Sequence, residues 1–305
     1  MTAGSRLALR LLLLVGCGAG EQVGGVAPPG TAPTPPSTPP PAGTRVDTLA
    51  RQDFEALARL DAFFQDIYYE GADRGTIRTD AALAASGSRF LESSFSSGGA
   101  ASGGALSLFL DGLAGRPAPV TNVRMEWSVF LPAGWQGGVR FGAVRGGNVR
   151  LGTPWSALGG AGVCPQSRPV ETAFFAAGTV AGEYGGNPGE VRFYAQWPGM
   201  TPQAGMCYGQ GGQSSGPWDY SRQRAFVPGG WRRLVHEVQL NDVGQANGWQ
   251  RIWLDGALVA EWTGLLWRTS PDVQISIVQL TPFVSTPVAQ PTFQRIDDLI
   301  VTTRR

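Results

Sequence analysis

The sequence is poor in the residues on which much nucleophilic and metal chemistry depends. Its 305 residues include one histidine, three cysteines and no lysine, so all 24 basic residues are arginines. The absence of lysine excludes mechanisms that use a lysine Schiff base or an ammonium group at a phosphate. One histidine and three cysteines also exclude a multi-histidine zinc site. We therefore predict no metal and no cofactor.

Charged residues are scarce as well. They make up 15% of the chain, and the net charge is +1 at neutral pH. Nucleic-acid-binding proteins normally carry a basic stripe, so we expect no nucleic-acid partner. Glycine (44 residues) and proline (23 residues) are abundant instead. This composition excludes a coiled coil or a helical bundle, which would be rich in alanine, glutamate and leucine.

The beginning of the chain has the features of an export signal. Residues 1–16 contain two arginines and a short apolar run, Leu11 to Val15, which is typical of a signal peptide and too short to span a bilayer. The segment that ends at Cys17 (LVGC) resembles a bacterial lipobox, in which the cysteine is lipidated. We predict a lipoprotein of the bacterial cell envelope, held at the outer membrane or cell surface by the lipid on Cys17 alone. An ordinary signal peptide with an incidental Cys17 is the alternative.

Residues 17–44 form the next segment, which is rich in proline, glycine and threonine. Such a segment cannot bury enough apolar surface to fold, and its prolines favour an extended spacer. We predict a disordered linker here and one folded domain, expected to be a monomer, over residues 45–305.

The domain is predicted to be an all-β antiparallel sandwich, because its apolar residues alternate in short segments separated by turn residues. Asp255-Gly256, between two apolar segments, marks a two-residue hairpin turn. Only residues 48–65 are periodic enough for a helix, and Asp53 to Glu55 could open a first strand instead. The clearest predicted strands are Asn122–Leu131, Glu190–Trp197, Trp231–Leu240, Trp249–Leu254, Ala257–Trp262 and Phe293–Thr302.

The same alternation places many polar side chains on the non-core faces of these strands. They could form an ordinary solvated face or line a groove that holds an extended polar chain. Arginine pairs well with carboxylates, so an acidic glycan is the natural ligand of such a groove. The residues predicted to bind it are Arg124, Glu126, Gln196, Arg233, Glu237 and Gln239.

Several segments resemble one enzyme family. Residues 230–241 (GWRRLVHEVQLN), followed by residues 247–256 (NGWQRIWLDG), are similar to the W-x-x-L, V-x-L-N, N-G and W-x-D-G pattern of polysaccharide lyase family 14 and related alginate and glucuronan lyases. Residues 130–138 (FLPAGWQGG) and 295–301 (RIDDLIV) extend the resemblance. It implies a concanavalin-A-like jelly roll and an acidic polysaccharide as partner.

The resemblance also implies site residues. These lyases cleave uronates by β-elimination, in which a cationic or amide group neutralises the carboxylate and other groups transfer protons. The family's Gly-Gly-Lys loop reads Gly137-Gly138-Val139 here, followed by Arg140. Its Tyr-x-Tyr pair becomes Arg192 and Tyr194, and its Ser-x-Arg pair aligns with Thr172 to Phe174 and loses the arginine. Tyr194 is thus implied as base or acid, with Arg192 and Arg140 as carboxylate neutralisers.

Three further residues complete the predictions. Cys164 and Cys207 are expected to form a disulfide, because they remain as an even pair in an oxidising compartment once Cys17 is lipidated. Alternation groups His236 with core residues, which favours a buried histidine over a general acid or base.

The predicted function is a surface-anchored lipoprotein that binds, and in one interpretation cleaves, an acidic polysaccharide. The missing lysine and the missing Ser-x-Arg pair leave an alternative open. In it the protein is a non-catalytic glycan-binding or structural envelope lipoprotein.

Overall fold

The structure is a computed structural model. It describes the ten ranges 45–69, 74–97, 102–110, 119–148, 174–182, 189–198, 209–210, 218–219, 224–284 and 288–304. These residues belong to one compact unit, Thr34–Arg305. The predicted signal peptide, linker, lipidation site Cys17 and disulfide Cys164–Cys207 lie outside the described residues.

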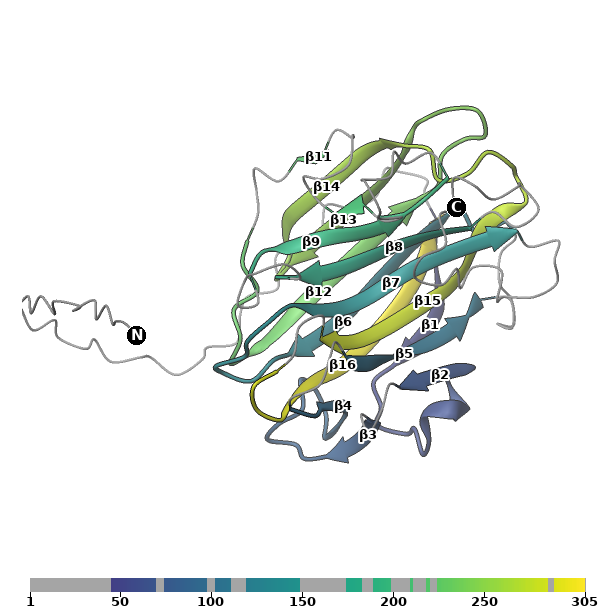
Figure 1. Cartoon of the computed structure of the whole chain (residues 1–305). Helices are drawn as coiled ribbons and strands as arrows, with labels where there is room; N and C mark the ends of the chain where they lie inside the picture. The colour runs from purple at the N-terminus through teal and green to yellow at the C-terminus, as the bar shows by residue number, and fades with distance from the viewer. Residues whose placement is uncertain are drawn as a thin grey trace, which may run out of the picture. The chain divides into compact units, whose positions relative to one another are not determined.

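Two antiparallel sheets form the domain (Figure 1). The nine-stranded sheet has the order β11-β14-β13-β12-β6-β16-β4-β3, and β1 also pairs with β16. Its strands are β1 (Val46–Gln52), β3 (Arg74–Thr79), β4 (Arg89–Phe95), β6 (Asn122–Phe130), β11 (Trp218–Asp219), β12 (Trp231–Gln239), β13 (Gly248–Leu254), β14 (Ala257–Leu265) and β16 (Thr292–Arg304).

The seven-stranded sheet faces the viewer in Figure 1 and has the order β10-β9-β8-β7-β15-β5-β2. Its strands are β2 (Asp66–Tyr69), β5 (Ser102–Phe109), β7 (Val139–Asn148), β8 (Phe174–Ala181), β9 (Val191–Gln196), β10 (Gly209–Gln210) and β15 (Val273–Val284). The predicted fold, an antiparallel β-sandwich of the jelly-roll type, is confirmed.

Local sequence explains the best-predicted strands. In β13 every second residue is buried, which is the pattern of a strand with one face on a core. The β13–β14 hairpin turns at Asp255 and Gly256, whose φ angles are 50° and 76°. Positive φ at both positions is what a two-residue hairpin turn requires, so the predicted hairpin is confirmed.

Neither alternative for residues 48–65, a helix or a first strand that opens at Asp53 to Glu55, matches the structure. Strand β1 ends at Gln52, before Asp53, and pairs with the last strand, β16. The only helical turn of this region is a 3-10 turn at Leu60–Ala62. Long-range pairing with β16 therefore overrides the local helical period. Within the ranges that the structure describes, no helix is long and apolar enough to cross a membrane.

The core between the sheets is rich in large aromatic side chains. Trp127, Phe193 and Trp262 are each no more than 1% exposed. Phe193 from the seven-stranded sheet contacts Trp262 from the nine-stranded sheet, with ring centroids 6.2 Å apart. Aromatic pairs of this kind contribute about 0.5–1.5 kcal/mol beyond the burial of their area. This packing holds β9 firmly, and β9 carries Tyr194 on its opposite face.

Candidate functional site

A β-bulge in β7 shapes the outer face of the seven-stranded sheet. The register of β7 against β8 shifts between Arg140 and Gly142. Gly142 faces the core, where an added Cβ would lie 3.1 Å from Met125 Cε and 3.2 Å from Trp127 Cζ2. The Thr179 hydroxyl donates a hydrogen bond of 3.1 Å to the Gly142 carbonyl. A bulge inserts one residue, so side chains beyond it change face.

The bulge brings two arginines to the same face. Arg140 and Arg145 are five residues apart, and strict alternation would place them on opposite faces. Phe141 and Val144 are instead both buried in the core, three residues apart. Ala143 and Arg145 consequently face outward together with Arg140, and all three line one hollow.

Strand register places the other side chains of this face. Tyr194 pairs with Gly178, which pairs with Ala143. Gln196 pairs with Ala176, which pairs with Arg145. Only a small residue of β8 therefore separates each of these two β9 residues from the β7 residue in line with it.

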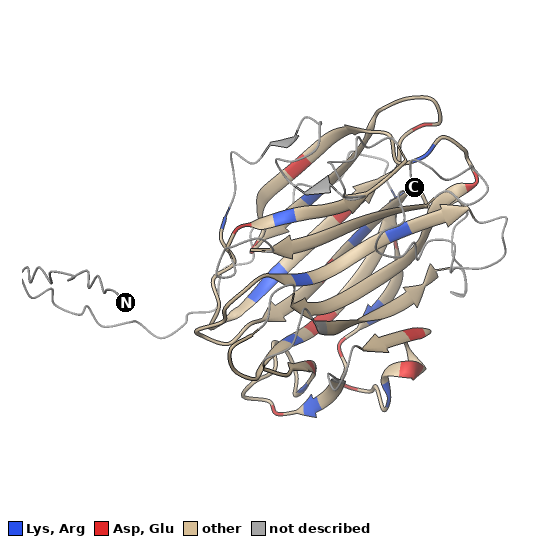
Figure 2. Cartoon of the chain, viewed as in Figure 1, with Lys and Arg blue, Asp and Glu red and all other residues tan. Residues whose placement is uncertain are grey.

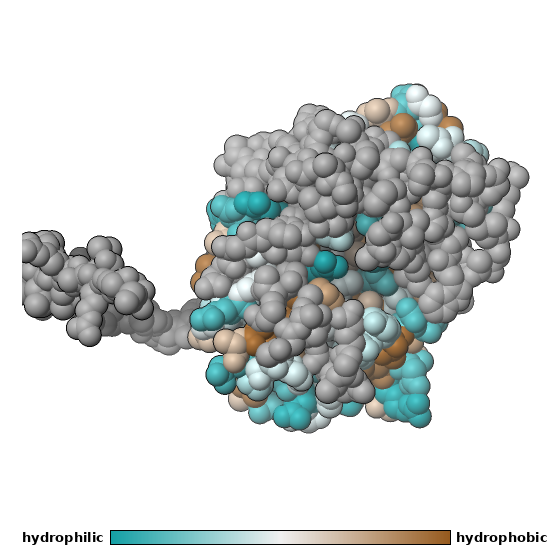
Figure 3. Space-filling model, in the orientation of Figure 1, coloured by the Kyte–Doolittle hydropathy of each residue, from teal (hydrophilic) through white to brown (hydrophobic). Residues whose placement is uncertain are grey.

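Small residues form the bottom of the hollow, and polar residues form its sides. It is lined by Arg140, Ala143, Arg145, Ala176, Gly178, Tyr194 and Gln196. Its volume is about 80 Å³, which is well below that of an enclosed ligand pocket. Figure 3 shows hydrophilic atoms at the centre of this face, and Figure 2 shows basic positions along β7 and on β9. Among the described residues that line it, none is acidic, so this part of the hollow suits an anion.

Arg140 is held between two aromatic rings. Its guanidinium carbon lies 4.5 Å from the centroid of the Tyr194 ring and 4.6 Å from that of Phe283. Phe283 is the cross-strand neighbour of Arg140 on β15. Each such cation–π contact contributes about 0.5–2 kcal/mol. The contacts fix Arg140 against the face of Tyr194.

Arg145 is a second cation beside Tyr194. Burial lowers the pKa of Arg145 to about 10, while the interaction with Tyr194 raises it and the charge of Arg140 lowers it. The side chain is therefore still protonated at neutral pH. Its Nε is buried and has no hydrogen-bond partner among the described residues. A buried N–H of a charged group without a partner is costly.

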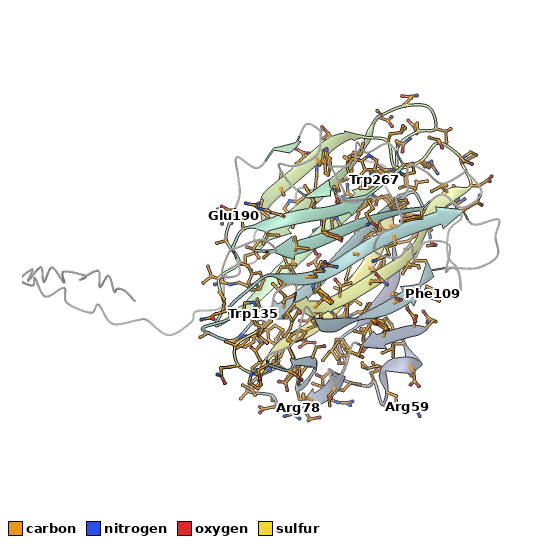
Figure 4. The ribbon with its side chains drawn as sticks, in the orientation of Figure 1. Arg59, Arg78, Phe109, Trp135, Glu190 and Trp267 are labelled. Carbon is orange, nitrogen blue, oxygen red and sulfur yellow. The ribbon has the colours of Figure 1, made fainter. Side chains whose placement is uncertain are left out.

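Arg192 lies on the same face as Tyr194 but does not line the hollow. It forms an ion pair of 2.6 Å with Glu190, both side chains being more than 40% exposed. Glu190 precedes β9, at the opposite end from Gln196 (Figure 4). The structure therefore brings together Arg140, Tyr194 and Gln196 of the predicted site and leaves Arg192 beside it, already paired with an acid.

Strand β8 supplies no polar side chain to the hollow. Its outward positions opposite β9 are Ala176, Gly178 and Val180. An added Cβ on Gly178 would lie 2.9 Å from the Tyr194 carbonyl oxygen. Of the residues aligned with Ser-x-Arg, Thr172 and Ala173 lie outside the described residues, and Phe174 is a buried residue of β8. The described part of β8 thus has no counterpart of the family's Ser-x-Arg pair.

The other predicted substrate-binding residues lie on the other sheet. Arg124 and Glu126 are in β6, and Arg233, Glu237 and Gln239 are in β12, both strands of the nine-stranded sheet. The core separates this sheet's outer face from that of the seven-stranded sheet. The prediction of one groove for all of these residues is therefore wrong, because alternation identifies a face but not the sheet to which it belongs.

These residues pair with one another. Glu237 is 1% exposed and lies 3.5 Å from Arg124 and 3.3 Å from Arg304. Arg233 Nε donates a hydrogen bond of 3.0 Å to Glu126. Gln239 donates to the backbone carbonyls of Thr121 and Leu240. Opposite charges thus alternate across neighbouring strands, as expected for pairs that stabilise a sheet. They account for these residues without a ligand.

His236 is a core residue, as alternation predicts. It is fully buried, and its Nε2 lies 3.1 Å from the Gln250 side-chain oxygen. Burial lowers its pKa to about 4, against a smaller opposing effect of that hydrogen bond. It is on the inner face of the nine-stranded sheet and does not line the hollow.

Arg145 is the residue that sequence reasoning missed. Alternation counted from Arg140 assigns it to the core face. A signal was present, because the apolar residues Phe141 and Val144 are three positions apart rather than two. A phase break of this kind in a strand indicates a bulge.

Comparisons with known proteins agree with this fold. Residues 186–285 match the family model described as Polysaccharide lyase 14. No curated protein matches the chain. The structure resembles the alginate lyase vAL-1 from Chlorella virus, with a TM-score of 0.60 and 13% identity over 84% of this chain and 100% of that chain.

Two further solved structures are similar. The marine PL-14 alginate lyase from Aplysia kurodai has a TM-score of 0.57 and 17% identity over 80% of this chain and 92% of that chain. Alginate lyase Aly36B, in a double mutant bound to alginate tetrasaccharide, has a TM-score of 0.50 and 15% identity over 70% of this chain and 80% of that chain. The predicted resemblance is confirmed: the domain is a jelly roll similar to those of alginate lyases, and residues 186–285 carry the polysaccharide lyase 14 sequence pattern.

Proposed function

We propose that the domain binds a uronate-containing polysaccharide across the outer face of the seven-stranded sheet and cleaves it by β-elimination at Tyr194. The observation that carries the proposal is the hollow itself. Its described lining contains two arginines, a tyrosine and an amide, and no acidic residue. The similar folds include alginate lyases, which supports a polyuronate as the substrate class.

The residues of the hollow fit the steps of the reaction. β-Elimination removes the C5 proton of a uronate, forms the C4–C5 double bond and expels the glycosidic oxygen at C4. The carboxylate next to C5 gains charge in the transition state, so fixed positive charge beside it lowers the barrier. The arginines supply that charge in the absence of a lysine.

Tyr194 is the proton-transfer group in this proposal. A tyrosine ionises near pH ~10 in water, and neighbouring positive charges favour its ionised form. Arg140 stacks on its ring, and Arg145 interacts with it electrostatically. The phenolate would accept the C5 proton, and the resulting phenol could then donate a proton to the leaving oxygen.

One observation favours a second candidate function. β8 contributes only Ala176, Gly178 and Val180 opposite β9, so the described lining of the hollow has fewer proton-transfer groups than the resemblance implies. In that case the domain would hold an acidic polysaccharide without cleaving it. Export and anchoring through Cys17 are part of both proposals and would place the domain on the bacterial cell envelope.

Product formation separates the two functions. The full chain would be incubated with alginate, glucuronan, pectate and hyaluronan, and the ultraviolet absorbance of the unsaturated uronate product would be followed. We expect the absorbance to rise with at least one of the four polymers. No rise, together with retention of the protein on an acidic-glycan column, would favour the binding function. No rise and no retention would contradict both.

A further inference from the structure

We propose that Arg145 and Gln196 form the subsite that binds the substrate's carboxylate, and that Arg140 serves to position Tyr194. This assignment rests on the proposed function. It divides the two arginines of the hollow between two tasks, whereas the sequence resemblance implies carboxylate neutralisation by Arg140 and Arg192.

Arg145 has an unused hydrogen-bond donor. Its Nε is buried and lacks a hydrogen-bond partner within the described ranges, and no ion pair joins it to an acidic residue there. An arginine binds a carboxylate best through two parallel N–H bonds. A free Nε beside the terminal nitrogens can make such a pair, so a carboxylate in the hollow would satisfy the donor.

Gln196 lies across the hollow from Arg145. It faces Arg145 across Ala176, because Gln196 and Arg145 are both cross-strand partners of that residue. Neighbouring strands are about 4.8 Å apart, so the two backbones are separated by about 10 Å. Both side chains line the hollow, and Ala176 leaves the space between them open. A carboxylate there can receive hydrogen bonds from the guanidinium and from the amide.

Arg140 already has partners for its guanidinium. Its guanidinium stacks on both Tyr194 and Phe283. A carboxylate that displaced it would break two cation–π contacts. Arg140 therefore acts through Tyr194, by holding the ring and placing a positive charge against it.

The proposal predicts that Arg145 recognises the carboxylate and nothing else in the substrate. The ligands would be a tetrasaccharide of whichever of the four polymers the protein cleaves or retains and its carboxyl-reduced, uncharged form, and affinities would be measured by calorimetry with the full chain. We expect Arg145→Gln to weaken binding of the charged tetrasaccharide about 10- to 100-fold, the effect of losing a charge-assisted pair of hydrogen bonds. Arg145→Lys should bind with intermediate affinity, because it keeps the charge and loses the two-pronged geometry. Binding of the uncharged form should be the same in all three proteins.

The matched control is Arg78→Gln. Arg78 is an exposed arginine on edge strand β3 of the other sheet (Figure 4). The substitution Arg78→Gln therefore removes the same charge without changing the hollow. We expect Arg78→Gln to bind the charged tetrasaccharide with wild-type affinity. The melting temperature of each variant would be recorded. Because Arg145 Nε has no partner to lose, Arg145→Gln should melt no lower than wild type.

Three results would overturn the proposal. The first is equal affinity of wild type and Arg145→Gln for the charged tetrasaccharide. The second is an equal loss of affinity by Arg145→Gln for the charged and the uncharged form. The third is no binding of the charged tetrasaccharide by the wild type. Binding without cleavage by the wild type, with the Arg145 effect intact, would instead contradict the proposed β-elimination and leave the carboxylate subsite supported.

Discussion

Replacement of Tyr194 by phenylalanine is expected to lower the rate of polysaccharide cleavage about 10²- to 10⁴-fold, the usual contribution of a proton-transfer group. The substitution removes the hydroxyl and keeps the ring on which Arg140 stacks. Substrate affinity should therefore change little while kcat falls. Initial rates of unsaturated product formation over a range of substrate concentrations would separate kcat from KM.

A matched control is available on the same sheet. Tyr68 is a tyrosine of β2 whose surface is 56% exposed and which does not line the hollow, so Tyr68→Phe should cleave at the wild-type rate. A Tyr194→Phe variant that keeps the wild-type kcat would contradict the assignment of proton transfer to Tyr194.

Acid should destabilise the fold through His236. Burial lowers the pKa of this histidine from 6.5 to about 4. Between these values the unfolded chain binds a proton at His236 that the folded protein does not, so the contribution of His236 to the free energy of unfolding falls as the pH decreases from 6.5 to 4. A shift of this size corresponds to about 3 kcal/mol at the acid end. Denaturant titrations at several pH values would measure the slope.

The variant His236→Gln isolates this contribution, because glutamine can still hydrogen-bond to Gln250 but does not titrate in this range. Between pH 6.5 and pH 4 the free energy of unfolding of wild type should therefore fall by about 3 kcal/mol relative to that of His236→Gln. Asp297 acts in the opposite direction, since burial and the charge of Asp298 raise its pKa to about 7. Asp297 is present in both proteins, so its contribution cancels when the pH dependence of the free energy of unfolding is compared between them. Identical slopes for the two proteins would refute the buried, neutral state of His236.

The fold could be predicted well because its signals are local. Alternation in β6, β9, β12 and β13 and the Asp255-Gly256 turn are properties of neighbouring residues. The helical period of residues 48–65 was misleading because β1 is stabilised by β16, a partner some 250 residues away that a local period cannot reveal. Long-range pairing of this kind is why β-propensity depends on context.

The candidate site could be predicted only in part. Tyr194, Arg140 and Gln196 were identified from the resemblance and from alternation, and all three line the hollow. Arg145 was missed because a single bulge in β7 reverses its face. Arg233 and Glu237 were assigned to the substrate because they face outward, but the sheet to which β12 belongs is decided by pairing with β6 and β13. Side-chain direction is local information, whereas the sharing of one surface is not.

The central claim is that the hollow on the seven-stranded sheet is the polysaccharide site, and filling it tests this most directly. Ala176 forms the floor between Gln196 and Arg145 and is 4% exposed, so Ala176→Leu would fill the space without changing any charge. Thr263→Leu adds a leucine at an exposed residue of β14 in the other sheet and serves as the control. Binding of the same charged tetrasaccharide to both variants would be measured by calorimetry. We predict that Ala176→Leu loses binding while Thr263→Leu keeps wild-type affinity. Wild-type affinity in a folded Ala176→Leu protein would contradict the assignment of the polysaccharide site to the hollow.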